Sequence, residues 1–169
     1  VYVSSGGMYG ARLSVADVEW RARPFDGVSA YAQAKRMQVV LAETLARQLA
    51  VDRITVDAMH PSWAETPALA SSQPRFHALT RRILRTPAQG ADTVLWLAAS
   101  EAARSETGRF WFDRAARRTH LLRRTRETPA ERAAFLELCR AAVPEFSRLG
   151  PTSRGEDLPA KSPRRGGSR

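Results

Sequence analysis

Apolar residues follow two patterns along this chain, a four-residue period in long stretches and short uninterrupted runs between them. The clearest long stretch covers residues 31–50, where large apolar side chains recur every four residues without an intervening proline or glycine. This pattern predicts an amphipathic helix whose apolar stripe packs in the core. The stripe consists of Met37, Leu41, Leu45 and Leu49.

Three stretches predict strands, the first and last as short apolar runs and the middle one by the alternation of Ile54, Val56 and Ala58 with Thr55 and Asp57. They lie at residues 1–4, 53–59 and 109–113. Two further helices are expected over residues 87–100 and from Thr128 to about residue 142. Each opens with a threonine cap, a proline in the first turn, and Gln or Glu three residues after the cap. A basic helix is also expected over residues 74–84.

The alternation of strands and helices favours an α/β fold with a parallel sheet. Such a sheet is buried on both faces and needs more than three strands, so we expect upstream strands to be missing. The irregular stretch 8–30 is interpreted as a surface excursion. Residues 150–169 are rich in Gly, Pro, Ser and Arg and are expected to form a disordered basic tail, which leaves 1–149 as the folded region.

The net charge of +10 raises the question of an anionic partner. Arginine is spread along the whole chain, and lysine occurs only as Lys35 and Lys161. We interpret the charge as a solvated basic surface and expect no specific nucleic-acid partner. Its densest group lacks interleaved aromatic residues and consists of Arg114, Arg117, Arg118, Arg123, Arg124 and Arg126.

Other function classes find little support in the composition. The longest strongly apolar stretch, near residues 93–99, is much shorter than the roughly 20 residues that span a bilayer, so no transmembrane segment is expected. Cys139 is the only cysteine, which favours a reducing, cytoplasmic setting. The three histidines have no spacing typical of metal ligands, so no metal site is expected.

Tyr31 and Lys35 are the strongest chemical candidates. Residues four apart share one face of a helix, so the Lys35 ammonium can approach the Tyr31 phenol. A neighbouring cation stabilises a phenolate and makes a phenol more useful for proton transfer. Lys35 also stands out because almost all other basic residues of the chain are arginines. We therefore predict a tyrosine that transfers protons.

Three motifs in this order resemble the short-chain dehydrogenase/reductases. The likeness covers about the first 113 residues, and the last expected helix continues it to about Phe146. It is closest to the retinol-dehydrogenase-like and dehydrogenase/reductase member 12-like branches of that family. The motifs are Val3-Ser4-Ser5-Gly6-Gly7, Tyr31-x-x-x-Lys35 and His60-Pro61-x-Trp63-Ala64-x-Thr66-Pro67. The run Gly108-Arg109-Phe110-Trp111-Phe112-Asp113 looks like the last strand of the family.

The resemblance implies a fold and a site. The fold would be the C-terminal part of a Rossmann-like doubly wound parallel sheet, with its first βαβ half absent from this chain. Ser5, or Ser4 if the alignment slips by one, would hydrogen-bond the substrate oxygen. Tyr31 would exchange a proton with that oxygen, and Lys35 would bind the nicotinamide ribose. In this family, the helix over 31–50 also commonly pairs two subunits, so a homodimer is an alternative to core packing.

The resemblance also implies NAD or NADP as cofactor, with Tyr31 and Lys35 among its contacts. The turn after the second strand would line the nicotinamide carboxamide through Pro61, Ser62, Trp63 and Thr66. A small carbonyl or alcohol would be the substrate. Trp63, Leu69 and Phe76 fall in the segment that commonly covers the substrate, which is consistent with an apolar substrate. Ordinary packing of these side chains is the alternative. His60 is interpreted as structural.

Two departures from the family pattern stand out. Ser62 replaces the usual glycine after the proline of the turn, which would carry a steric cost if that residue needs a positive φ. A G-x-x-x-G-x-G cofactor loop does not occur in the sequence, nor does the residue that selects between NAD and NADP.

Two hypotheses follow. In the first, this chain is the catalytic part of an NAD(P)-dependent oxidoreductase, and the 169-residue chain by itself binds no nucleotide tightly and turns over no substrate. In the second, it is a catalytically inactive, truncated relative that acts as an assembly module or binds anionic partners through its basic surface.

Overall fold

The computed structural model describes residues 1–64, 78, 80, 84–143 and 145. The basic tail at 150–169 and most of the helix predicted over 74–84 lie outside the described residues. Within that helix, the Leu84 N–H donates to the Thr80 carbonyl at 3.1 Å, which is a helical hydrogen bond. Thr66, Leu69 and Phe76 also lie outside the described part of the chain.

A four-stranded sheet in the order β1-β2-β3-β4 forms the centre of the molecule. The first three strands are parallel: β1 (Tyr2–Val3), β2 (Ala58–Met59) and β3 (Phe110–Phe112). The strand β4 (Ala115–Arg117) returns antiparallel to β3 and was not expected from the sequence. The mixed, mostly parallel sheet confirms the α/β class. The three expected strands are each shorter than their apolar runs.

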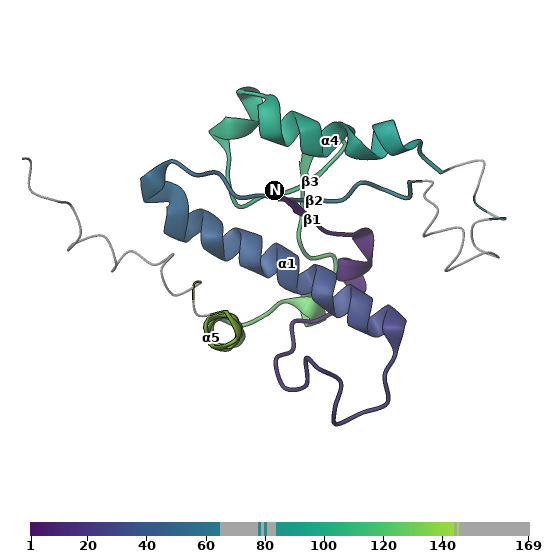
Figure 1. Cartoon of the computed structure of the whole chain (residues 1–169), viewed down its shortest axis with the longest axis vertical. Coiled ribbons are helices and arrows are strands. Elements are labelled where there is room, and N and C mark those ends of the chain that lie inside the picture. The colour runs from purple at the N-terminus through teal and green to yellow at the C-terminus, as the bar shows by residue number, and fades with distance from the viewer. Residues whose placement is uncertain (65–77, 79, 81–83, 144, 146–169) are drawn as a thin grey trace, which may run out of the picture.

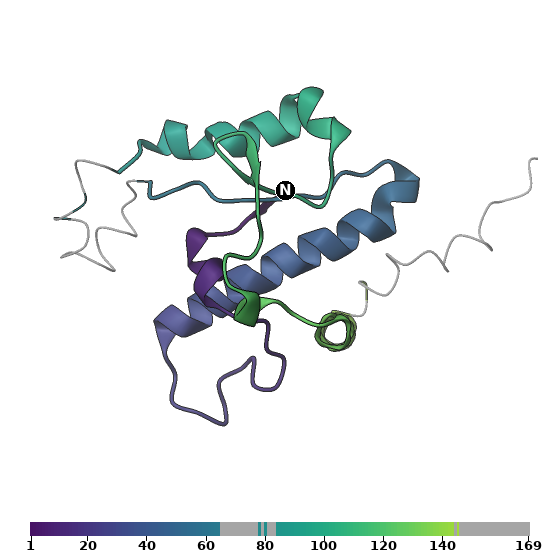
Figure 2. The ribbon, with the colours of Figure 1, turned by 180° about the vertical axis from the view of Figure 1, so that it is seen from behind.

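Helices cover both faces of this sheet. The helix α1 (Gly27–Leu49) lies along one face and α4 (Pro87–Ala99) along the other, with α5 (Pro129–Ala142) beside α1 (Figures 1 and 2). The predicted threonine caps of α4 and α5 are confirmed, each with the reciprocal hydrogen bonds of a capping box. The helix α1 begins earlier than expected, because Asp26 accepts hydrogen bonds from two amides of its first turn.

The hydrophobic core is divided by the sheet. On the α1 side, Ala58 and Phe110 pack against the helix, and on the α4 side Met59 and Trp111 pack against Leu97. Side chains of successive strand residues point to opposite faces, which explains this division. The α1 face of the core contains Met8, Val39, Ala42, Leu45, Ala46, Leu49, Val56, Ala58 and Phe110.

The predicted stripe of the long helix is largely confirmed as core. Leu45 and Leu49 are buried, whereas Met37 and Leu41 are partly buried and pack against buried neighbours. These side chains therefore pack within the chain. The homodimer through residues 31–50 stays a prediction.

The interpretation of residues 8–30 as a surface excursion was wrong for its first part. Met8 and Leu13 are buried almost completely, and each belongs to a core cluster that includes residues of α1. The 3-10 helix η1 (Gly6–Gly10) directs Met8 inward. None of the described helices is both long and apolar enough to cross a membrane.

Candidate active site

The carboxyl ends of the three parallel strands meet at one edge of the sheet. Val3 is in register with Met59, and Met59 is in register with Trp111. Ser4 and His60 therefore leave neighbouring strands at the same level. This edge is where open α/β sheets bind ligands.

Two serines follow β1 and have different surroundings. The Ser4 hydroxyl is buried and donates to the Lys35 carbonyl oxygen at 2.8 Å, which fixes β1 to α1. Ser5 is less buried and caps η1, with its Oγ accepting a hydrogen bond from the Gly7 amide at 3.2 Å. The Ser4 hydroxyl is thus used within the fold, whereas the Ser5 hydroxyl borders a space beside Gly7 that Tyr31 also borders.

Gly7 lies between Ser5 and Tyr31. A methyl group added at Gly7 would lie 3.7 Å from Ser5 Oγ and 3.8 Å from Tyr31 Cε1. Both side chains therefore border the same small space, which a glycine keeps open. The Tyr31 side chain projects from the first turns of α1 and is 52% exposed. Gly7 belongs to the first sequence motif, but no role in the site was predicted for it, because the need for a small residue depends on this tertiary contact.

Lys35 lies one helical turn after Tyr31 and completes the group. Its Nζ is 5.5 Å from the centre of the Tyr31 ring. The ammonium also donates to the Val3 carbonyl oxygen at 3.0 Å and to Gln38 Oε1 at 3.3 Å. Lys35 is thus held at the end of β1, beside the phenol ring. The structure brings Ser5, Tyr31 and Lys35 together, and their catalytic roles stay predictions.

The turn at residues 61–63 follows β2 and packs against α4. Ser62 has a φ of +67°, which is the left-handed conformation that glycine adopts readily. The Trp63 carbonyl accepts the Arg85 amide at 2.9 Å. Gly90 of α4 faces this turn, since a methyl group there would lie 3.0 Å from the Ala64 Cβ and 3.8 Å from the Pro61 carbonyl oxygen.

The His60 side chain lies between Gly6, which follows β1, and Phe112 of β3. Its ring stacks on Phe112 with centres 5.3 Å apart, and its Nε2 would lie 3.1 Å from a methyl group at Gly6. Burial, together with the nearby Arg85, lowers the pKa of His60 and so favours the neutral form of the ring. These contacts are consistent with a structural role.

Arg85 and Asp113 form an ion pair beside the turn, with Nη2 2.8 Å from Oδ2. They line a shallow depression of about 480 Å³ together with Ala88, Gln89 and Asp92. Sequence reasoning missed this pair. Arg85 directly precedes a helix cap and Asp113 directly follows a strand, but nothing local shows that they meet.

The sequence is similar to several oxidoreductases. It is 43% identical over 148 residues to the human protein "Dehydrogenase/reductase SDR family member 12", covering 86% of this chain and 46% of that protein. It is 34% identical over 110 residues to zebrafish polyprenol dehydrogenase, covering 59% of this chain and 32% of that protein. The chain belongs to the short-chain dehydrogenase/reductase family.

More distant relatives agree with this assignment. Mouse retinol dehydrogenase 14 is 30% identical over 91 residues, which cover 49% of this chain and 27% of that protein. No family model matches the chain. As a short-chain dehydrogenase/reductase, the chain spans about half the length of the human relative. The resemblance expected from the three motifs is thereby confirmed.

Proposed function

We propose that this chain carries the Ser5–Tyr31–Lys35 site of an NAD(P)-dependent oxidoreductase that interconverts a carbonyl and an alcohol. The observation that supports the proposal is the grouping of the three side chains at the carboxyl end of β1. Ser5 and Tyr31 border the space at Gly7, and Lys35 Nζ lies 5.5 Å from the phenol ring. The names of the relatives as dehydrogenases or reductases point to the same class of reaction.

Each side chain has a distinct task in this proposal. The Ser5 hydroxyl donates a hydrogen bond to the substrate oxygen and orients the reacting carbon. The Tyr31 phenol donates a proton to that oxygen in the reduction and accepts one in the oxidation. The Lys35 ammonium stabilises the phenolate that forms when the proton has left. Its contact with the Val3 carbonyl fixes its position relative to β1.

The residues present suit the nicotinamide half of the cofactor. Lys35 and Tyr31 offer hydrogen-bond donors to a ribose, and the turn at 61–63 offers backbone groups to a carboxamide. When bound, the nicotinamide supplies or accepts the hydride. The G-x-x-x-G-x-G loop that would hold its pyrophosphate does not occur in the sequence.

An apolar alcohol or carbonyl compound is the substrate class we favour. Two relatives are named after apolar alcohols, namely polyprenol dehydrogenase and retinol dehydrogenase 14. Trp63, beside the turn, exposes 53% of its surface and offers an apolar contact at this edge.

The test uses a chimaera in which this chain replaces the matching segment of the human relative. With NADH or NADPH and a panel of apolar carbonyl compounds, we expect Tyr31→Phe to lower kcat by about 100- to 10,000-fold, the usual contribution of a general acid. Tyr2→Phe is the matched control, because Tyr2 lies in β1 and packs against the core cluster, and it should retain activity. A Tyr31→Phe chimaera as active as the control would contradict the proposal.

The 169-residue chain by itself is expected to bind NADH and NADPH weakly and to be inactive. The sequence contains no G-x-x-x-G-x-G loop, whose backbone N–H groups would hold the pyrophosphate. A fluorescence titration of the chain with each nucleotide tests this, and micromolar affinity would refute it.

A further inference from the structure

Residues 114–126 form a strongly basic surface segment that the proposed site does not use. These thirteen residues include six arginines and no acidic residue. Leu121 and Leu122 lie in the middle of the segment and are 68% and 42% exposed. The arginines are all exposed and are Arg114, Arg117, Arg118, Arg123, Arg124 and Arg126. We call this stretch the 114–126 segment.

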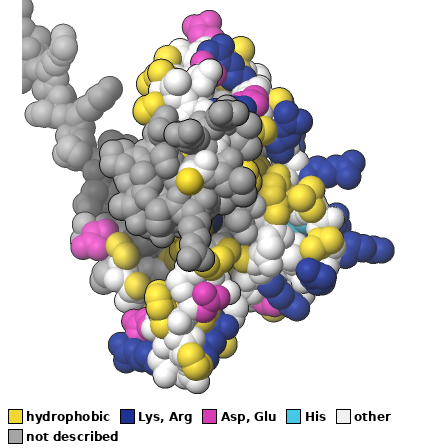
Figure 3. Space-filling model, turned by 90° about the vertical axis from the view of Figure 1, so that its right-hand side faces the viewer, with side chains coloured by type: hydrophobic (Ala, Val, Ile, Leu, Met, Phe, Trp, Pro, Cys, Tyr) yellow, Lys and Arg dark blue, Asp and Glu magenta, His cyan; other side chains and the backbone are white. Residues whose placement is uncertain are grey.

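The positive charge of the segment is largely uncompensated. Only Arg114 has an ion pair among the described residues, with Asp92 of α4. The next acidic residue along the chain, Glu127, is 1% exposed and is bound by Arg132, so it neutralises little of the outer surface. In Figure 3, basic side chains project on the right-hand side of the view, with exposed hydrophobic side chains between them.

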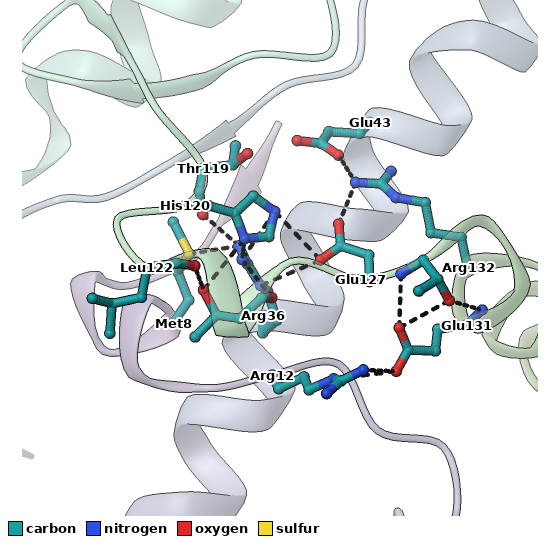
Figure 4. Close-up of polar contacts among 12 residues, drawn as sticks. Met8, Arg12, Arg36, Glu43, Thr119, His120, Leu122, Glu127, Glu131 and Arg132 are labelled. Carbon is teal, nitrogen blue, oxygen red and sulfur yellow. Dashed lines mark hydrogen bonds and ion pairs between the residues drawn. The ribbon is translucent and has the colours of Figure 1, made fainter.

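Buried contacts hold the segment in one conformation. The fully buried Arg36 of α1 donates to the Thr119 carbonyl at 2.6 Å and also contacts the His120 ring. Thr125 Oγ1 donates to the Leu122 carbonyl at 2.8 Å. Figure 4 shows the Leu122 side chain pointing away from this cluster. His120 and Thr125 thus anchor the backbone from within, and the two leucines face solvent.

The segment also lies at the far edge of the sheet from the β1 end. It begins next to β4, which is the edge strand opposite β1 in the order β1-β2-β3-β4. If further strands of a longer protein pair with β1, β4 remains an edge strand and the 114–126 segment beside it remains accessible.

We propose that the 114–126 segment docks the protein on an anionic membrane surface. Guanidinium groups bind lipid phosphates and carboxylates, and an exposed Leu-Leu pair gains free energy by entering the headgroup region. A nucleic acid would bind the arginines but gain nothing from the leucines. The segment contains no Phe, Tyr or Trp that could stack on bases, and its His120 ring contacts Arg36 and Thr125. The combination of unpaired arginines and outward leucines therefore favours lipid.

Sedimentation of the full 169-residue chain with vesicles tests the proposal. We expect binding to vesicles of phosphatidylcholine with phosphatidylserine and much weaker binding to phosphatidylcholine alone. Binding should weaken as salt rises, because exposed charges are screened. A duplex DNA of random sequence is the competing probe, and a chain that binds DNA but not the anionic vesicles overturns the proposal.

Two variants locate the binding surface. Each basic residue near an anionic membrane increases partitioning about fivefold, so R123Q together with R124Q should weaken vesicle binding about 30-fold. Arg47→Gln with Arg104→Gln has the same net charge and alters exposed arginines elsewhere, so it should bind like the parent. Replacing both leucines by serine should also weaken binding, at every salt concentration.

Every chain in this comparison keeps residues 144–169, so any contribution from them is common to all. If the Arg123/Arg124 variant binds as tightly as the Arg47/Arg104 control, the segment is not the docking surface. If the leucine variant binds unchanged, the leucines do not enter the membrane and the proposal fails in that form. Circular dichroism of each variant establishes that it is folded.

Discussion

Ser62 has a backbone conformation that a residue with a side chain adopts only at a cost. Its φ of +67° brings Cβ close to the neighbouring carbonyl, a strain that glycine avoids. We expect Ser62→Gly to raise the free energy of unfolding by about 0.5–1 kcal/mol, since the relieved strain exceeds the extra entropy of glycine in the unfolded chain. Urea denaturation of both proteins measures the difference.

Ser100 provides the matched control. It caps the C-terminal end of α4 with a φ of −85°, where glycine relieves no strain. Ser100→Gly should therefore leave stability unchanged or lower it by about 0.5–1 kcal/mol. If both substitutions shift stability in the same direction, the strain at Ser62 is not the cause.

Single residues of the candidate site could be predicted where the sequence itself carries the motif. The spacing of Tyr31 and Lys35 was enough to expect both on one helical face, and Ser62 was noted as a departure before its φ was known. The role of Gly7 could not be predicted, because its small size matters only in the space that the Ser5 and Tyr31 side chains both border.

The approach of α4 to the turn after β2 depends on Gly90. A methyl group there would lie 3.0 Å from the Ala64 Cβ, which is closer than ordinary van der Waals contact, so one of the two atoms would have to shift. Alanine favours a helix by about 1 kcal/mol over glycine, whereas overpacking costs about 1–3 kcal/mol. We expect Gly90→Ala to lower the free energy of unfolding by about 1 kcal/mol, measured by urea denaturation.

Gly10 is the comparison for that change. A methyl group added at Gly10 would meet no atom within 4 Å. Gly10→Ala should change stability by less than about 0.5 kcal/mol or raise it slightly. Equal destabilisation by the two alanines would show that the packing of Gly90 against the turn has little effect.

Helices were predicted more accurately than strands, because their ends are encoded locally. Thr86 and Thr128 cap α4 and α5 through residues only three positions away. The strand β4 was missed because its hairpin turn consists of Asp113 and Arg114, both with a φ of +54°, and has no glycine. That turn is supported by ion pairs with Arg85 and Asp92, which lie more than twenty residues away in sequence.

The whole molecule is joined by a buried charge cluster that no sequence pattern revealed. Arg36 and Glu43 of α1 meet Arg132 of α5 and Glu127, which precedes that helix (Figure 4). Glu127 Oε2 lies 3.9 Å from Arg36 Nε and 3.3 Å from His120 Nε2. Two of these pairs, Arg36 with Glu127 and Glu43 with Arg132, join residues about ninety positions apart along the chain, so they depend on the completed fold.

Substitution of the buried Glu127 should therefore lower the free energy of unfolding strongly. Glu127→Gln leaves two guanidinium groups, one of them fully buried, without their shared carboxylate. Breaking a buried ion pair costs about 3–5 kcal/mol, and the partial exposure of Arg132 places the expected loss near 3 kcal/mol. Glu137→Gln, in an exposed pair with Arg140, should change stability by less than about 1 kcal/mol.

The pH dependence of stability shows whether Glu127→Gln acts by removing the carboxylate charge or by changing the packing. Burial alone would raise the pKa of Glu127, but a backbone amide, Arg132 and Arg36 outweigh it, and the pKa lies below the ordinary value of 4.5. A lowered pKa stabilises the folded state above about pH 4.5, and this stabilisation disappears as pH falls through the folded value. The difference between the parent and Glu127→Gln should thus be large at pH 7 and shrink steadily in acid. If it stays constant between pH 7 and pH 3, the carboxylate charge is not what holds α1 to α5.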